Sequence, residues 1–108
     1  MNTAHQAIDI ARPKSKKNKS GFLEKERNWI AKAIDLGYLD TFRNANPQKT
    51  GIYTCWPYSR NSRERNIGWR LDYIFVDSQL AEKIHRAIVH MQVFGSDHCP
   101  ISINIDLN

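Results

Sequence analysis

The residues best suited to chemistry lie in a turn near the end of the chain, Gly95-Ser96-Asp97-His98-Cys99-Pro100. Histidine changes protonation near neutral pH, and a carboxylate on its second ring nitrogen fixes the tautomer and favours the imidazolium. Asp97 is a poor partner for His98, because the side chains of adjacent residues usually point apart. Asp72 is better, since an unpaired carboxylate in its otherwise apolar stretch would be costly. These residues weakly indicate a hydrolase, and a surface or capping role for each stays open.

Basic charge is the second chemical feature, and it is local. The chain has a formal net charge of +5, and its lysines and arginines gather in residues 12–27 and 60–70. Such clusters suit a polyanion, because each phosphate that they neutralise releases counterions. A solvated loop would have the same composition, so both interpretations stay open at this point.

Length and composition limit the class of protein. A chain of 108 residues, 41% hydrophobic and 25% charged, holds at most one domain. No apolar run approaches the ~18 to 20 residues that span a bilayer, and the start lacks the pattern of a secretory signal. We therefore expect a cytoplasmic location and no membrane partner. Cys55 and Cys99 have neither disulfide-framework nor zinc-ligand spacing, which predicts two reduced, buried thiols and no zinc site.

Hydropathy patterns predict the elements that must position these residues. Apolar residues at helical spacing predict a helix over 23–36, with Gly37 where a glycine would end it. A short helix or turn is expected over 78–84. Period-two alternation predicts strands over residues 52–58, 69–76, 85–93 and 101–107. The fold class is therefore α+β, with mostly antiparallel strands and one amphipathic helix.

Two motifs then reveal a resemblance. Gly-Trp-Arg-Leu-Asp-Tyr at 68–73 and Gly-Ser-Asp-His-Cys-Pro at 95–100 resemble the C-terminal signature of exonuclease III type abasic-site (AP) endonucleases, in the endonuclease/exonuclease/phosphatase superfamily. Weaker matches follow the same order: Asn2-Thr3-Ala4-His5, Gly21-Phe22 with Glu26-Arg27, Leu39-Asp40-Thr41-Phe42-Arg43 and Tyr53-Thr54-Cys55-Trp56. The resemblance spans essentially the whole chain. It implies the C-terminal half of a DNase I-like, four-layer α/β-sandwich.

The resemblance also implies site residues. His98 would be the catalytic histidine at the scissile phosphate, Asp72 the carboxylate that orients it, and Asn2 a group that holds the phosphate and the attacking water. Asp97 matches the acid near the divalent-metal site, where Mg²⁺ is expected and Mn²⁺ is the alternative. Cys55 stands where some relatives have an aromatic wall residue. The DNA-binding residues would be two walls of the abasic-sugar pocket (Trp69, Leu71), a groove loop (Arg60, Asn61, Arg63) and a lysine-rich segment along the phosphates (Lys14, Lys16, Lys17, Lys19).

The implied function is that of an exodeoxyribonuclease III or AP endonuclease in base excision repair. Such an enzyme hydrolyses phosphodiesters at abasic sites and 3′ ends of duplex DNA, and the chemistry fits histidine, carboxylates and a divalent cation. Two alternatives stay open. One is another superfamily phosphodiesterase, acting on phosphoinositide or sphingomyelin, and the other is an inactive DNA-binding remnant.

The resemblance also has a departure. The family motif Gly-Asp-x-Asn would place its catalytic aspartate one residue before Met1, and the N-terminal half of family members has no counterpart here. We therefore expect residues 1–108 to be a single partial domain, the C-terminal portion of a monomeric enzyme. Half a sandwich leaves an apolar sheet face uncovered. The isolated chain is thus expected to be prone to aggregation and nearly inactive.

Overall fold

The structure is a computed structural model that describes residues 4–11, 24–58 and 61–106. Its regular elements are short, and connecting segments carry much of the chain. In chain order they are η1 (Ala7–Asp9), α1 (Glu24–Asp35), β1 (Tyr38–Asp40), α2 (Thr41–Ala45), β2 (Phe75–Asp77), η4 (Ser78–Lys83), β3 (Ile84–Val89) and β4 (Ile101–Ile105). Among these described residues, no helix is long and apolar enough to cross a membrane.

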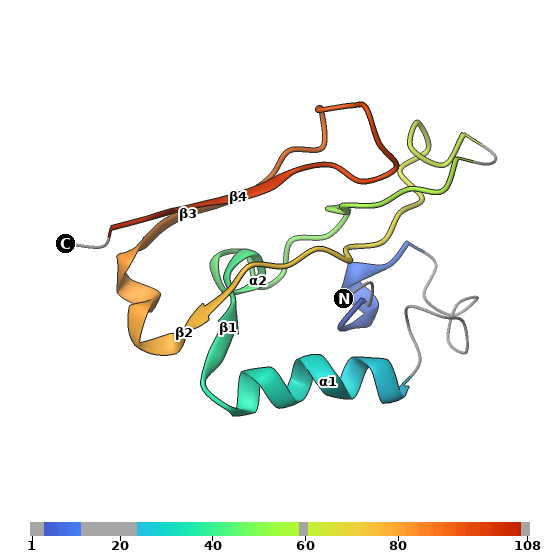
Figure 1. Cartoon of the computed structure of the whole chain (residues 1–108). Coiled ribbons are helices and arrows are strands. Elements are labelled where there is room, and N and C mark those ends of the chain that lie inside the picture. Colours follow the sequence, from blue (N-terminus) through green and yellow to red (C-terminus); the bar gives the residue numbers. More distant parts are fainter. Residues whose placement is uncertain (1–3, 12–23, 59–60, 107–108) are drawn as a thin grey trace.

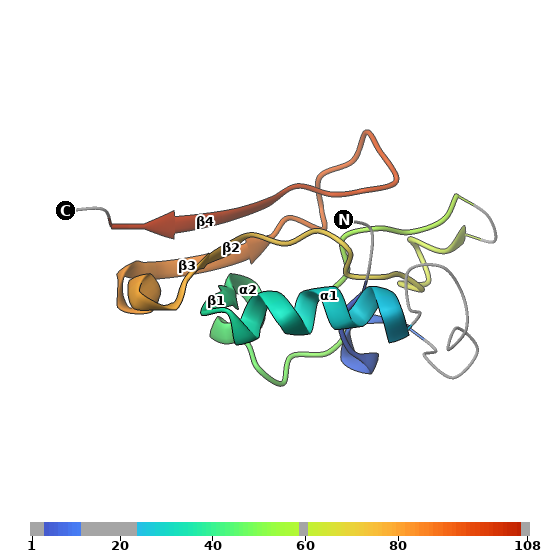
Figure 2. The same ribbon diagram turned by 60° about the horizontal axis from the view of Figure 1, so that its bottom comes forward.

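The strands form two antiparallel pairs. β1 pairs with β2, with Leu39 opposite Val76, and β3 pairs with β4, with Ala87 opposite Ile103. The β3–β4 hairpin runs along one side of the molecule and α1 along the other, with β1, β2 and α2 between them (Figures 1 and 2). α1 packs against β1, and α2 packs against both β1 and β3. β1 and α2 therefore connect α1 to the β3–β4 hairpin. The predicted α+β class with mostly antiparallel strands is confirmed.

The helix predicted over 23–36 is present as α1. Its apolar stripe turns inward at Ile30, which is fully buried. The helix ends where the sequence indicates: Gly37 has φ +102° and its amide donates to the Ile34 carbonyl (3.0 Å). Glycine is suited to this left-handed conformation because it has no Cβ. The short helix predicted over 78–84 is also present, as the 3₁₀ helix η4.

The four predicted strands are only partly correct. β3 ends at Val89 because the chain then turns back, with the Val93 amide donating to the His90 carbonyl (3.1 Å). The predicted strand over 69–76 is regular only at β2, and that over 52–58 contributes a single pairing residue, Cys55.

The segments around Cys55 instead form a four-residue ladder of isolated antiparallel contacts. In order, it pairs Ile10 with Trp69, Trp69 with Cys55, and Cys55 with His98. Directly opposite residues of neighbouring strands point to the same face. The ladder therefore brings four distant parts of the chain side by side with these side chains on one face.

Gly68 is required for this close approach. A Cβ at residue 68 would lie 2.6 Å from Trp56 Nε1 and 2.8 Å from the Cys55 carbonyl oxygen. Both distances are shorter than nonbonded contacts allow. The Gly-Trp-Arg motif thus begins with a residue that lets segments 55–56 and 68–69 pack backbone to backbone.

The apolar core is small. Among the described residues it consists of Ile30 on α1 and two clusters, Ala4 with Ile10 and Leu71, and Tyr53 with Trp56 and Cys99. Large apolar side chains remain exposed elsewhere: Trp29 (65%), Leu36 (71%), Tyr58 (82%) and Phe94 (73%). Trp29 lies on α1 and the other three lie outside the strands. The uncovered apolar sheet face and aggregation therefore stay predictions.

A buried charge cluster compensates for the small core. The Arg70 side chain is 1% exposed, and its Nε donates to Asp9 Oδ1 (2.7 Å) while its Nη1 donates to Asp40 Oδ1 (3.0 Å). Arg43 Nη2 adds a second bond to Asp9 Oδ1 (2.7 Å). Two guanidinium groups thus neutralise two buried carboxylates. Burial lowers the pKa of Arg70, but the hydrogen bonds to Asp40 and Asp9 outweigh it and raise the pKa above its usual value.

We expect Arg70→Met to destabilise the chain by about 3–5 kcal/mol, because it leaves two carboxylates buried with too few partners. The control is Arg86→Met on the exposed part of β3, which should change stability by less than about 0.5 kcal/mol. Urea unfolding followed by circular dichroism measures both. Similar unfolding midpoints for the two variants would show that the cluster does not hold the fold.

Candidate active site

His98 and Asp72 form a close pair. His98 Nδ1 lies 2.7 Å from Asp72 Oδ2, and the two side chains are 30% and 35% exposed. An ionised carboxylate only accepts hydrogen bonds, so the proton lies on Nδ1. Nε2 is then the ring nitrogen left for a substrate, a water or a metal. The structure thus brings together the two residues that the motifs singled out, and their catalytic role stays a prediction.

Backbone hydrogen bonds on either side of His98 hold it opposite Cys55. The Cys99 amide donates to the Thr54 carbonyl (2.8 Å) and the Trp56 amide to the Asp97 carbonyl (2.9 Å). These two bonds flank a non-hydrogen-bonded antiparallel pair, in which opposite side chains come closest. The side chains of residues 55 and 98 are therefore held together on one face.

Thr54 is a positioning residue that the sequence analysis missed. It is fully buried, and its hydroxyl oxygen accepts hydrogen bonds from the backbone amides of Leu71 (2.9 Å) and Asp72 (3.2 Å). Successive amides of a regular strand point to opposite edges, so sharing one acceptor bends the chain there. This bend ends the strand expected over 69–76. Arg70 and Asp72 have separate partners: the first faces the buried carboxylates and the second faces His98.

Asp97 and the predicted sugar-pocket walls lie beside this pair. The Asp97 carboxylate is half-buried and accepts a bond from Ser96 Oγ (3.2 Å). Leu71 is buried against Ala4 and Ile10, and the partly buried Trp69 packs on the same cluster. An apolar cluster therefore adjoins the polar groups; Leu71 is itself buried, and the role of Trp69 and Leu71 as pocket walls stays a prediction.

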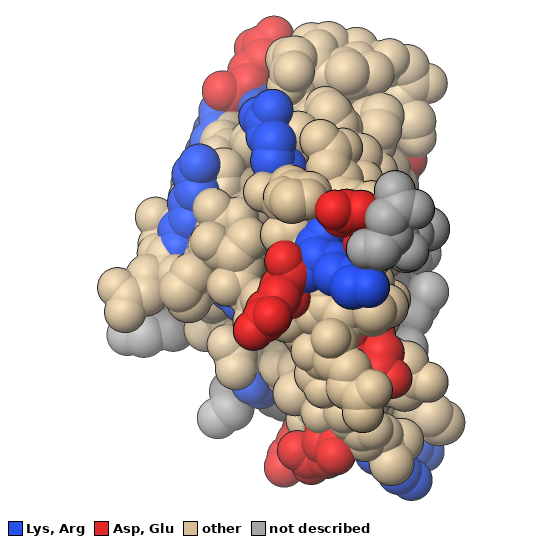
Figure 3. Space-filling model, turned by 90° about the vertical axis from the view of Figure 1, so that its left-hand side faces the viewer, with Lys and Arg blue, Asp and Glu red and all other residues tan. Residues whose placement is uncertain are grey.

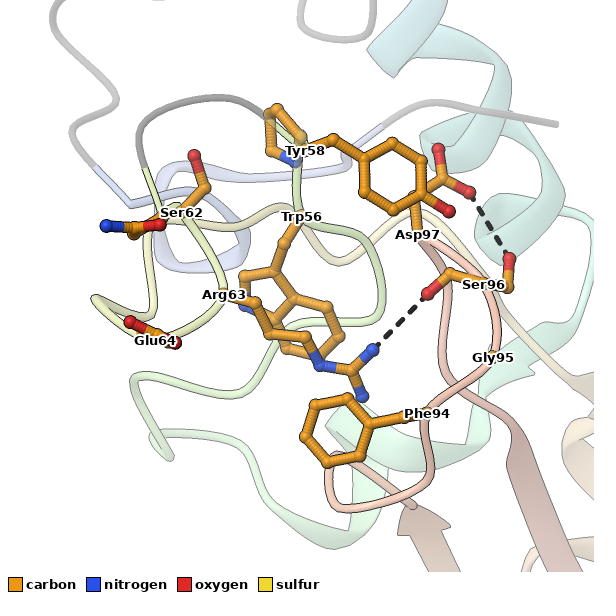
Figure 4. Close-up of a pocket in the computed structure, with 11 residues that line it drawn as sticks. Trp56, Tyr58, Ser62, Arg63, Glu64, Phe94, Gly95, Ser96 and Asp97 are labelled. Atoms are coloured by element: carbon orange, nitrogen blue, oxygen red, sulfur yellow. Dashed lines mark hydrogen bonds between the residues drawn. The ribbon is translucent and has the colours of Figure 1, made fainter.

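Arg63 is held by backbone carbonyls and by two aromatic rings. Its Nη2 donates to the carbonyls of Met91 and Val93 (both 2.7 Å), and its Nη1 to that of Ser96 (3.3 Å). The guanidinium lies over the rings of Phe94 (4.0 Å to the centroid) and Trp56 (4.4 Å), as Figure 4 shows. Arg63 thus ties the segment before His98 to the loop after Trp56. A contact with DNA by Arg63 stays a prediction.

A groove of about 400 Å³ opens between these two loops. Its rim includes the exposed rings of Tyr58 and Phe94, and Asp97 lies at one end (Figure 4). Asn61 lines it too, exposed and with φ 53°, a conformation that asparagine tolerates better than most residues. The other predicted residues lie outside the described part of the chain: Asn2, Lys14, Lys16, Lys17, Lys19 and Arg60.

At the end of the molecule away from the groove, positively and negatively charged side chains are mixed. Figure 3 shows the face on the left-hand side of Figure 1, where lysine and arginine lie interspersed with aspartate and glutamate. A polyanion needs a surface of one sign. Among the described residues, this face therefore offers no continuous basic patch for a phosphate backbone.

The two cysteines are free thiols, as predicted, but the prediction that both are buried is correct only for Cys99. Cys99 is buried and its Sγ donates to the Tyr53 carbonyl (3.7 Å), whereas Cys55 is half-buried. Burial, with smaller effects of Asp97 and Asp72, raises the pKa of Cys55 to about 11. The Cys55 thiol is therefore protonated at physiological pH.

Sequence comparison decides the family. The profile of the endonuclease/exonuclease/phosphatase family matches residues 1–98. The chain belongs to this family. Within it, the chain is 41% identical over 107 residues to the exodeoxyribonuclease of Bacillus subtilis, covering 99% of the chain and 42% of the relative. It is 43% identical over 109 residues to the DNA-(apurinic or apyrimidinic site) endonuclease of Dictyostelium discoideum, covering 100% and 30%. The chain thus spans less than half the length of these relatives.

Solved structures of the family agree. The AP endonuclease of Archaeoglobus fulgidus superposes with a TM-score of 0.88 at 32% identity, covering 98% of this chain and 43% of that one. The 3′-5′ exonuclease of Neisseria meningitidis gives 0.91 at 27% identity, with the same coverages. This family member therefore has the fold of the corresponding part of these nucleases, which confirms the expected DNase I-like fold.

We expect Arg63→Lys to loosen the segment that precedes His98. Lysine cannot reproduce a planar donor that bonds three carbonyls and stacks on two rings. Loss of one charged hydrogen bond corresponds to an increase of about 10-fold or more in amide exchange of residues 92–98. Hydrogen exchange measures this, with Arg86→Lys as the exposed control. Unchanged exchange in Arg63→Lys would refute the assigned role.

Proposed function

We propose that this chain supplies the His98–Asp72 half of a DNA phosphodiesterase of the exodeoxyribonuclease III and AP endonuclease type. The observation that carries the proposal is the 2.7 Å contact between His98 Nδ1 and Asp72 Oδ2, next to Asp97 and to the apolar walls Trp69 and Leu71. Relatives named exodeoxyribonuclease and AP endonuclease, at 41% and 43% identity, support the choice of reaction. The proposed substrates are abasic sites and 3′ ends of duplex DNA in base excision repair.

His98 would act on the phosphate through Nε2. With Nδ1–H donated to Asp72, neutral His98 can accept a proton at Nε2, and as imidazolium it can donate one to a phosphoryl oxygen. Asp72 stabilises the imidazolium and fixes the ring orientation, so it acts through the histidine. The half-buried position of both side chains raises the strength of these interactions above that in water.

The family is one of metal-dependent nucleases, and we propose Mg²⁺, with Mn²⁺ as the alternative. Asp97 fits as one ligand, because its carboxylate lies half-buried beside His98 and its bond from Ser96 Oγ leaves lone pairs for a cation. Mg²⁺ often takes one or two carboxylates and completes its shell with water and phosphate oxygens. When bound, it would neutralise charge on the phosphoryl oxygens.

The groove beside Asp97 suits DNA more than a lipid headgroup. Its exposed rings, Tyr58 and Phe94, are flat surfaces on which displaced bases can stack. Flipping a nucleotide out of the helix distorts the duplex, and aromatic side chains that stack on the bases lower the energetic cost of that distortion. The proposed DNA-binding residues are Trp69, Leu71, Asn61 and Arg63 at the site, with Arg60 and the lysines of residues 14–19; Asn2 is proposed to hold the phosphate.

A chimera tests the proposed function. The chain replaces the matching segment of the Bacillus subtilis exodeoxyribonuclease, and Mg²⁺-dependent cleavage of an abasic-site duplex is measured. We expect the chimera to cleave, and His98→Ala or Asp72→Asn to reduce the rate by about 10²–10⁴-fold, since each removes part of the proton transfer. His85→Ala, an exposed histidine on β3, is the matched control and should leave the rate unchanged.

Three outcomes would contradict the proposal. Cleavage that His98→Ala does not reduce would remove the histidine from the reaction. Hydrolysis of phosphoinositide or sphingomyelin without cleavage of DNA would indicate a different branch of the superfamily. Salt-sensitive DNA binding without turnover at any Mg²⁺ concentration would indicate a binding remnant. The chain assayed alone should show little activity.

A further inference from the structure

We propose that Cys55, Asp97 and His98 form a binding site for a zinc ion, against the expectation of no zinc site that the cysteine spacing gave. One ligand atom from each side chain can be chosen such that all three lie within 4.8 Å of one another. The three are an imidazole, a thiol and a carboxylate, which are the ligand types that zinc prefers. Cys55 sets this group apart from the oxygen ligands that Mg²⁺ takes.

The backbone preorganises two of the ligands. Cys55 and His98 are the opposed, non-hydrogen-bonded pair of the ladder, flanked by the Cys99–Thr54 and Trp56–Asp97 backbone bonds. Their side chains share one face without any rearrangement of the chain. Asp97 is adjacent to His98 and supplies the third ligand from the same turn.

The contact between His98 and Asp72 is the second observation that points to a metal. Zinc-bound histidines commonly donate their other ring N–H to a carboxylate, which fixes the tautomer and makes the ligating nitrogen more basic. His98 Nδ1 has such a partner in Asp72 Oδ2 at 2.7 Å. Nε2 is therefore the nitrogen offered to the ion, and Asp72 acts as its outer-shell carboxylate.

The dimensions suit zinc after a small contraction. A tetrahedral ion with bonds of about 2.0–2.3 Å holds its ligand atoms roughly 3.5 Å apart. The present separations are at most 4.8 Å, so side-chain rotation has to bring the atoms closer by no more than about 1.3 Å. Binding replaces the S–H bond of Cys55 by a Zn–S bond, and the proton passes to solvent. Three protein ligands leave a fourth position open for water or a phosphate oxygen.

One consequence rests on the proposed function. Zinc on Nε2 would occupy the nitrogen that the proposed hydrolysis uses, so zinc would inhibit the nuclease. The binding site itself does not depend on that activity.

Cobalt absorption tests the site on the 108-residue chain. Co²⁺ replaces zinc in such sites, and a bound thiolate gives a sulfur-to-cobalt charge-transfer band. We expect this band in the wild type and in Cys99→Ser, the matched control, and its loss in Cys55→Ser. Zn²⁺ should displace the Co²⁺. Asp72→Asn should weaken zinc binding by about 10–100-fold while keeping the thiolate ligand.

Two results would overturn the site: the absence of the band in a folded wild-type chain, or an equal band in Cys55→Ser. If Cys55→Ser does not fold, as judged by circular dichroism, Asp97→Asn replaces it and should weaken zinc binding by at least 10-fold; unchanged binding would refute the site. The chimera separates the two proposals. A thiolate band without DNA cleavage would leave the zinc site and reject the nuclease, whereas cleavage without a band would do the reverse.

Discussion

The buried ion pairs of the Arg70 guanidinium are the interactions on which the arrangement of the surrounding segments depends. With a side chain 1% exposed, it bonds Asp9 in the N-terminal segment and Asp40 at the end of β1. Asp40 also begins α2 by accepting the Arg43 amide (3.3 Å). The apolar core of the described residues is small, so this charged cluster links segments that hydrophobic contacts alone would hold weakly. Its cost is fragility, because loss of one member leaves unpaired charge buried.

The same cluster reaches the candidate active site through the backbone. Trp69, next to Arg70, stands between Ile10 and Cys55 in the ladder, and Cys55 pairs with His98. Thr54 connects both sides, since its carbonyl accepts the Cys99 amide and its hydroxyl accepts the Asp72 amide. The geometry of the His98–Asp72 pair is therefore set by a chain of backbone contacts that begins at a buried ion pair.

Local signals were sufficient for some features and insufficient for others. The helix before Gly37 and the turn holding His98 could be predicted, because periodicity and short motifs act over a few residues. Arg70 could not, because its partners lie 30 and 61 residues away and an arginine in an apolar run resembles a surface position. The strand expected over 52–58 failed for a related reason: residues 54–56 pair briefly with two distant segments, around Trp69 and around His98, and form no long ladder with either. The closeness of Cys55 to His98 likewise needs the tertiary fold.

Measurement of the His98 tautomer is the most direct test of the His98–Asp72 pairing. Nitrogen-15 NMR of the imidazole ring distinguishes a protonated from an unprotonated ring nitrogen. The structure predicts a proton on Nδ1, shared with Asp72 Oδ2 at 2.7 Å, and an unprotonated Nε2 in the neutral ring. A neutral ring with its proton on Nε2, unaffected by Asp72→Asn, would contradict the pairing from which both proposals start.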